Sequence, residues 1–295
     1  RNGSKYLFLS RPRRFGKSLF VSTLQAYFEG RKNLFNGLAL GDYEKEWVKY
    51  PVFHFDMSTA KHMNPADLIN ELEGKLSQLE QIYGTEDWAI KTNQRLECLV
   101  KRAYKQTGQK VVILIDEYDA PLLDVAHDND RLIALRDVMR NFYSPLKYRE
   151  PVLRFVFLTG ITKFSQVSIF SELNNITLLS MNDDYAGICG ITKEELLTQM
   201  SEDIGELAEK IGITKEQAIE KLKEHYDGYH FSGESPDIFN PYSLLNCFNE
   251  KKFGSYWFAS GTPTYLINMM RKFDVIPSDI TRVEACLLYT SPSPR

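Results

Sequence analysis

The chain has 295 residues, of which 43% are hydrophobic and 25% are charged, and its formal net charge is −3. This length allows one large globular domain or two ordinary ones. The small net charge gives no global reason to expect nucleic acid or an anionic membrane as a partner. The longest apolar runs, such as Val111–Ile115, are far shorter than the roughly 20 residues that a membrane-spanning helix needs.

The four cysteines are widely separated and form no CxxC pair. A zinc site or a disulfide framework is therefore not expected, and a reducing, cytoplasmic location is the simplest inference. The chain begins at Arg1 rather than at Met, so we expect the natural N-terminus to be missing. Residues 286–295 (CLLYTSPSPR) resemble a translated sequencing adapter, and we treat them as a non-native tail.

The first part of the chain alternates between strand and helix patterns. Tyr6–Ser10 is a short apolar run, and Lys17–Phe28 carries apolar residues at helical spacing. The same criteria predict strands at Val52–Met57, Val111–Ile115, Leu153–Thr159 and Ile176–Leu179, and helices at Pro65–Tyr83, Asp87–Tyr104 and Arg131–Tyr143. This alternation predicts an α/β domain with a mostly parallel sheet.

After about residue 180 the pattern becomes helical. Helices are predicted at Thr192–Ser201, Lys215–Tyr226, Pro241–Asn249 and Pro263–Lys272, with little strand between them. We therefore expect a core domain over residues 1–190 and a smaller helical or lid region over residues 191–285.

Arg11–Ser18 (RPRRFGKS) lies between the first predicted strand and the first predicted helix. Gly16, Lys17 and Ser18 match the end of the phosphate-binding pattern G-x-x-x-x-G-K-[ST], whereas Arg11 stands in place of its first glycine. In such loops backbone N–H groups and the helix N-terminus hold phosphates, the lysine neutralises charge and the hydroxyl binds Mg²⁺. Alone, the Gly-Lys-Ser sequence is weak evidence, because the start of an ordinary helix can also carry it.

Asp116 and Glu117 follow the buried run Val111–Ile115. In open α/β sheets ligands bind at the carboxyl edge of the strands. An acid there can hold Mg²⁺ beside Ser18, and the next acid can polarise a water for attack on a γ-phosphate. A solvated turn would explain the two acids alone, but their occurrence with the loop predicts a site for ATP and Mg²⁺.

Several segments together resemble the AAA-ATPase-like family of bacterial proteins. They are SRPRRFGKSL, IDEYDAPL and LTGITKFSQVSIFSELNN, followed by HYDGYHF, FNPYSLLNCF and YWFASGTPTYL. The resemblance extends from Lys5 to Lys272. That family's own loop begins with Ser-Arg-Pro-Arg-Arg, so Arg11 departs only from the general pattern.

The resemblance implies a P-loop NTPase with a five-stranded sheet in the order 5-1-4-3-2, often followed by a PD-(D/E)XK nuclease-like domain. It places Lys17 and Ser18 on phosphates and Mg²⁺, Asp116 on Mg²⁺, and Glu117 as catalytic base. The nucleotide-binding loop would comprise Arg11, Pro12, Arg13, Arg14, Phe15, Gly16, Lys17, Ser18 and Leu19. Strand four would end in a sensor, for which we choose Thr159; Thr162 and Lys163 are rivals, and a simple Thr-Gly turn is the alternative.

Other candidates favour structural roles or stay open. Arg11, Arg13 and Arg14 could contact phosphates or pair with acids such as Asp119 and Asp124. The spacing of His225, Asp227 and His230 disfavours a metal site and favours aromatic packing by Tyr226, Tyr229 and Phe231. Asn240–Pro241 is typical of a helix start. Lys251, Lys252, Arg271 and Lys272 are better explained as solvated helix ends than as a nucleic-acid patch.

The favoured function is an ATPase module that switches an attached or partner effector. A nucleotide-binding scaffold with little hydrolysis is the main alternative. A small-molecule kinase ranks last, because adjacent acids at a strand end favour water activation. An arginine finger would need a subunit contact, so oligomerisation stays open.

Overall fold

In the computed structural model, residues 4–161, 176–233 and 235–256 are described. The chain divides into two compact units. The first contains residues up to Leu9 together with Ser18–Thr177, and the second contains Ser10–Lys17 together with the residues from Leu178 onward. The expected domain boundary near residue 190 stays a prediction. No helix within the described ranges is long and apolar enough to span a membrane.

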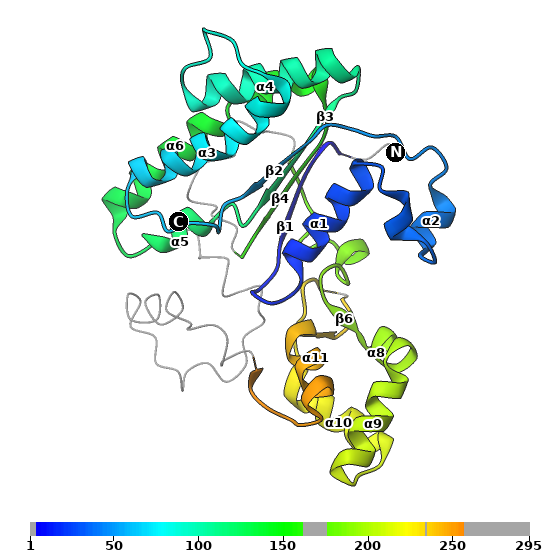
Figure 1. Ribbon diagram of the computed structural model, residues 1–295. Coiled ribbons are helices and arrows are strands. Elements are labelled where there is room, and N and C mark those ends of the chain that lie inside the picture. The colour runs from blue at the N-terminus through cyan, green and yellow to red at the C-terminus, as the bar shows by residue number, and fades with distance from the viewer. Residues whose placement is uncertain (1–3, 162–175, 234, 257–295) are drawn as a thin grey trace. The chain divides into compact units, whose positions relative to one another are not determined.

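The first unit is built on a five-stranded sheet in the order β2-β3-β4-β1-β5 (Figure 1). The strands are β1 (Tyr6–Ser10), β2 (Val52–Asp56), β3 (Val111–Asp116), β4 (Leu153–Gly160) and β5 (Ile176–Leu178). The β2–β3 and β3–β4 pairs are parallel. Read from the opposite edge, this is the order 5-1-4-3-2 that the family resemblance implies.

The helices of this unit follow the strands in alternation. The longer ones are α1 (Lys17–Phe28), α3 (Pro65–Tyr83), α4 (Thr92–Thr107) and α6 (Asn129–Tyr143), and the shorter ones are α2 (Ala39–Tyr43), α5 (Ala120–Asp124) and α7 (Pro145–Tyr148). Single 3-10 turns occur at η1 (Lys32–Phe35) and η2 (Glu150–Val152).

One face of the sheet is covered by α3, α4 and α6, which pack on one another (Figure 1). Leu68, Leu72 and Leu76 of α3 are fully buried there, as their four-residue spacing predicts. They meet alternate residues of the strands, including Phe53 and Ile113. This layer fixes the sheet and leaves the carboxyl ends of the strands to position polar groups.

The second unit is mainly helical. It contains α8 (Lys193–Gln199), α9 (Ser201–Ile211), α10 (Lys215–Tyr226) and α11 (Pro241–Glu250), a 3-10 turn η4 (Asp183–Tyr185), and the short strands β6 (Ile191–Thr192) and β7 (Ile238–Phe239). The two strands pair antiparallel, which adds a small sheet to a region predicted to hold little strand. The Asn240 side chain accepts a hydrogen bond from Ser243 N at 2.9 Å, which confirms the predicted start of α11.

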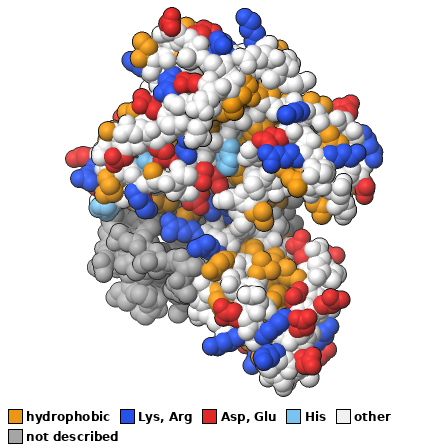
Figure 2. All heavy atoms as spheres, viewed as in Figure 1, with side chains coloured by type: hydrophobic (Ala, Val, Ile, Leu, Met, Phe, Trp, Pro, Cys, Tyr) orange, Lys and Arg blue, Asp and Glu red, His pale blue; other side chains and the backbone are white. Residues whose placement is uncertain are grey.

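The surface carries both signs of charge. In the view of Figure 2, acidic and basic side chains are interspersed on each unit. On this face, the distribution matches the small net charge of −3.

Candidate functional site

The loop between β1 and α1 has an unusual backbone. Arg14 and Gly16 both adopt left-handed conformations, with φ of 68° and 84°. Only Gly16 does so without a steric penalty. A Cβ at Gly16 would meet no atom within 4 Å, so its backbone angle rather than crowding requires glycine. Left-handed residues in a loop turn backbone N–H groups toward one side, the geometry that binds phosphates.

Lys17 and Ser18 begin α1 at the end of this loop. The Lys17 side chain is 4% exposed, and its Nζ donates to Pro12 O at 3.3 Å. The ammonium is thus held across the loop by the loop's own backbone. Ser18, Gly16 and Arg13 are exposed to solvent, as is the Leu19 side chain.

The Arg11 side chain has different partners from those we expected. It is 1% exposed. Its guanidinium donates to the backbone carbonyls of Ser10, Ser180, Tyr185, Ala186 and Ile188 at 3.0 to 3.2 Å. These contacts show that the guanidinium helps to hold the loop. The predicted contact of Arg11 with nucleotide stays a prediction.

Asp116 and Thr159 connect the carboxyl ends of β3 and β4 through a hydrogen bond. Both are buried, and Thr159 Oγ1 donates to Asp116 Oδ1. The Glu117 N–H donates to Asp116 Oδ1 at 3.1 Å and to Thr159 Oγ1 at 3.2 Å. Tyr118 N donates to Thr159 O at 2.9 Å. The hydroxyl of Thr159 therefore orients both the Asp116 carboxylate and the backbone of Glu117.

Glu117 occupies a strained position directly after β3. Its φ of 48° lies in the left-handed region, which costs a non-glycine residue about 1 to 2 kcal/mol. The hydrogen bonds to Asp116 and Thr159 hold it there. Strain of this kind gathers at functional sites, where surrounding contacts keep a side chain in one orientation.

Asp119 is a buried acid that the sequence did not single out as part of this site. Its Oδ2 accepts a hydrogen bond from Ile161 N at 2.9 Å. The neighbouring Gly160 has no room for a side chain, since a Cβ there would lie 2.7 Å from Asp119 Oδ1 and 2.7 Å from Tyr118 Cε1. The Thr-Gly pair is thus required where the two strand ends approach. Thr162 and Lys163, the rival sensor residues, lie outside the described residues.

Strand register places Asp116 and Thr159 on one face of the sheet. His54, Leu114 and Phe157 are register partners across three strands, so their side chains project to the same face. Asp116 and Thr159 each follow two residues after a member of this set, and side chains two residues apart share a face. Both therefore point to the face opposite the α3–α4–α6 layer.

Helix α1 packs on this same face and begins at the carboxyl edge. Phe20 contacts Phe157 with ring centroids 5.5 Å apart, and Phe28 contacts Phe155 at 5.1 Å. The helix therefore runs back along β4 from its carboxyl end. Ser18, in the first turn of α1, belongs to the same edge and face as Asp116.

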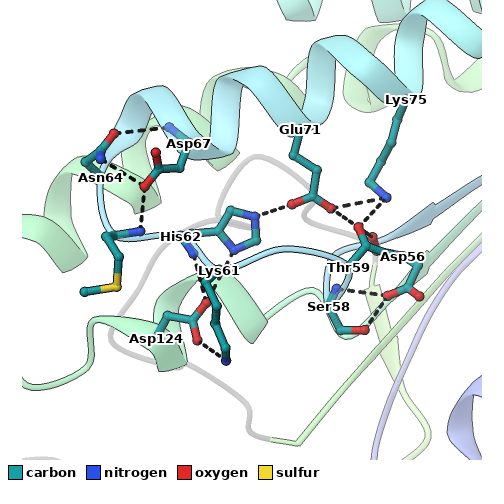
Figure 3. Close-up of polar contacts among 11 residues, drawn as sticks. Asp56, Ser58, Thr59, Lys61, His62, Asn64, Asp67, Glu71, Lys75 and Asp124 are labelled. Carbon is teal, nitrogen blue, oxygen red and sulfur yellow. Dashed lines mark hydrogen bonds and ion pairs between the residues drawn. The ribbon is translucent and has the colours of Figure 1, made fainter.

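A second polar cluster in the first unit is centred on His62, in the segment between β2 and α3 (Figure 3). His62 is fully buried, and its Nε2 lies against Glu71 Oε2 of α3. Its Nδ1 is 3.5 Å from Asp124 Oδ2, which also accepts the His62 N–H at 3.1 Å. The imidazole therefore connects α3 to Asp124, the last residue of α5.

The acids of this cluster have further partners. Lys61 Nζ donates to Asp124 Oδ1 at 2.8 Å, and Lys75 Nζ is 3.2 Å from Glu71 Oε1. Burial raises the pKa of Glu71, but hydrogen bonds from Thr59, His62 and Lys75 outweigh it and hold the pKa below its usual value. Sequence patterns could not predict this cluster, because its members come from three separate segments.

The histidines of the second unit have structural contacts. His230 Nε2 lies 3.0 Å from Asp237 Oδ1, and His225 Nδ1 contacts Lys221 O at 2.8 Å. Tyr226 and Phe231 are buried, which confirms the predicted aromatic packing. Across the ranges that the structure describes, no group of three or more His, Cys, Asp or Glu side chains could hold a metal ion.

The structure thus has an α/β sheet with the order β2-β3-β4-β1-β5, a Gly-Lys-Ser loop after β1 and a buried aspartate at the end of β3. A family model described as Predicted AAA-ATPase matches residues 1–170, and the chain belongs to this family. The chain is also 36% identical over 273 residues to a protein of Azotobacter chroococcum mcd 1, described as an uncharacterized protein in vnfD 5'region. The match covers 91% of this chain and 49% of that relative, so the chain spans about half the relative's length.

Proposed function

We propose that this chain is an ATPase module that binds ATP with Mg²⁺ and hydrolyses it. Binding would be carried by the loop of residues 11–19, whose left-handed Arg14 and Gly16 turn the backbone. Lys17 would supply the positive charge for the β- and γ-phosphates, and its buried position across the loop supports this role.

Ser18 and Asp116 form a suitable pair for Mg²⁺. A serine hydroxyl and a carboxylate are the oxygen ligands that Mg²⁺ prefers, with phosphate oxygens and water completing the shell. The register of β3 and the packing of α1 place both residues on one face at one edge. When bound, Mg²⁺ would neutralise charge on the phosphates.

The single observation that carries the proposal of hydrolysis is the set of hydrogen bonds among Asp116, Glu117 and Thr159. In it, Glu117 is held in a strained left-handed conformation beside a buried aspartate. A carboxylate held in that way can orient a water and accept its proton as the water attacks the γ-phosphate. Thr159 acts in this proposal by orienting Asp116 and Glu117, and it is the residue that we propose as the sensor at the end of β4.

The ATP cycle would drive or switch an effector. The effector would be an attached domain, such as the nuclease-like domain that the family resemblance implies, or a separate partner. The relative extends over about twice the length of the matched region, which is compatible with an attached effector. The competing proposal is a scaffold in which bound nucleotide holds a shape and little hydrolysis occurs.

A comparison of three variants tests the proposal. Glu117→Gln should lower kcat by about 10² to 10⁴, the usual contribution of a general base, with ATP affinity nearly unchanged. Lys17→Ala should weaken ATP binding itself. Glu194→Gln, which removes an exposed acid in the first turn of α8, is the matched control and should behave as the parent protein.

The outcomes separate the two proposals. Mg²⁺-dependent turnover that survives Glu117→Gln would refute the catalytic assignment. Tight ATP binding with background turnover in the parent protein would favour the scaffold. Failure of the parent protein to bind ATP would refute both.

A further inference from the structure

The loop of residues Ser10–Lys17 is built into the helical unit. By its contacts, this segment belongs to the same compact unit as the residues from Leu178 onward. Ser10 N and Ser10 Oγ both contact Ser180 Oγ, at 2.7 and 2.9 Å. The side chains that follow in the loop continue this attachment.

Arg11 makes the most extensive attachment. All three guanidinium nitrogens donate to backbone carbonyls, four of which belong to the segment between Ser180 and Ile188. The guanidinium carbon also lies 4.1 Å from the centre of the Phe231 ring. A planar group with five N–H donors can satisfy such a set, whereas a lysine ammonium with three cannot.

Phe15, the residue directly before Gly16 and Lys17, provides a second attachment. It is fully buried, and its ring lies edge-on to Tyr229 at 4.7 Å and to Phe231 at 5.5 Å. Ile238 completes this cluster. The exposed Arg14 between the two anchors lies over the Tyr242 ring at 4.9 Å.

Phe231 therefore contacts both anchors of the loop, while it comes from a segment more than 200 residues away in the sequence. A loop that binds phosphate through its backbone needs that backbone held in one conformation before the ligand arrives, because ordering it on binding costs affinity. The left-handed conformation of Arg14 is unfavourable for a residue with a side chain, and Gly16 can adopt many backbone conformations. The loop residues themselves therefore do not favour the observed backbone, and the contacts of Arg11 and Phe15 hold it.

We propose that Arg11, Phe15 and Phe231 are positioning residues through which the helical unit sets the phosphate affinity of the loop. The proposal rests on the proposed function, since it assumes that the loop binds the phosphates of ATP. By thermodynamic reciprocity, ATP on the loop also stabilises the segments that grip it. The helical unit is then both a support for the loop and the part that responds to nucleotide.

Substitutions at Phe231 test the first half of the proposal. Phe231→Leu keeps an apolar side chain but loses the ring, and should raise the Kd for ATP about tenfold. Phe231→Tyr keeps the ring and should bind within about threefold of the parent protein. Phe253→Leu is the matched control, because Phe253 stacks on Tyr226 and contacts His225 in the same unit; it should bind ATP as the parent protein does.

Hydrogen exchange tests the second half, with a readout that a general loss of stability does not produce. ATP should slow amide exchange in residues 178–190 and 226–242, which hold the partners of Arg11 and Phe15. Helix α9 (Ser201–Ile211) is the internal reference, and its exchange should not change.

The outcomes distinguish this proposal from the proposed function. If the parent protein binds ATP but Phe231→Leu binds equally well, or Phe253→Leu weakens binding as much, the positioning role is refuted. Equal protection of α9 and of residues 178–190 and 226–242 on ATP binding would refute the reciprocal effect. If the parent protein does not bind ATP, the proposed function itself fails.

Discussion

Replacing Thr159 by valine tests whether its hydroxyl organises the site. The substitution keeps the branched shape but removes the donor to Asp116 and the acceptor for the Glu117 N–H. A hydrogen bond to a charged group contributes about 1.5 to 3 kcal/mol. The added buried methyl offsets roughly 0.8 kcal/mol of this loss. The expected net loss of unfolding free energy is about 1 to 2 kcal/mol.

Thr159→Ser is the matched control. It keeps the hydroxyl and loses one buried methyl, which costs about 0.5 to 1.5 kcal/mol. The two variants should therefore have similar stabilities in urea unfolding followed by fluorescence of Trp47 and Trp88, which lie in the first unit. They should differ in ATP turnover, because only Thr159→Ser keeps Asp116 and Glu117 oriented.

We expect Thr159→Val to lower kcat at least about tenfold, equivalent to about 1.4 kcal/mol of transition-state stabilisation. Thr159→Ser should turn over ATP within about threefold of the parent protein. Equal turnover by the two variants would refute the reasoning, since the loss would then follow stability rather than the hydroxyl.

Two further predictions concern stability. Because the pKa of Glu71 is lowered in the folded protein, its contribution to stability is present above its unfolded pKa of about 4.3 and is lost as pH falls through the folded pKa. Glu71→Gln should therefore make the free energy of unfolding depend less on pH in this acidic range. An unchanged pH dependence would contradict this. Gly160→Ala should destabilise by about 1 to 3 kcal/mol because its Cβ meets Asp119 and Tyr118. Gly74→Ala, where a Cβ in α3 meets nothing within 4 Å, should instead stabilise by about 0.5 to 1 kcal/mol, and thermal unfolding of both checks the contrast.

Local pattern was sufficient for most elements of the fold. The predicted β1, α1, α3 and α10 have the observed bounds, because apolar spacing and end signals such as the Asn64 cap of α3 act within a few residues. Errors occurred where a side chain redirects the backbone. Helix α4 begins at Thr92 rather than at the predicted Asp87, since the Gln94 side chain accepts from Ile90 N and Lys91 N and so caps the helix there.

Helix α9 was missed although its signal was present. Ile204, Leu207 and Ala208 have helical spacing and are buried, but the prediction ended at Ser201. Met200 leaves the helical conformation between α8 and α9, with φ of −113° and ψ of 20°. The predicted helix Pro263–Lys272 lies outside the described residues.

In the candidate site too, features set by local sequence could be predicted and features set by distant residues could not. The strand end at Asp116 could be predicted, because strand type and the edge at which ligands bind follow from local sequence. The role of the Arg11 side chain could not be predicted, since four of its five carbonyl partners lie 169 to 177 residues along the chain. An arginine beside a phosphate loop favours phosphate contact on chemical grounds alone, and backbone carbonyls carry no sequence signature.

The role of His62 could not be predicted from the sequence, because it depends on residues that only the folded structure brings together. A lone histidine between a strand and a helix predicts nothing, and its meaning comes from Glu71 and Asp124, which arrive with α3 and α5. Burying either acid without a partner would cost several kcal/mol, so the chain brings the three together when the first unit packs. Asp124 ends α5, and the packing of α3 against His62 therefore contributes to where α5 is held.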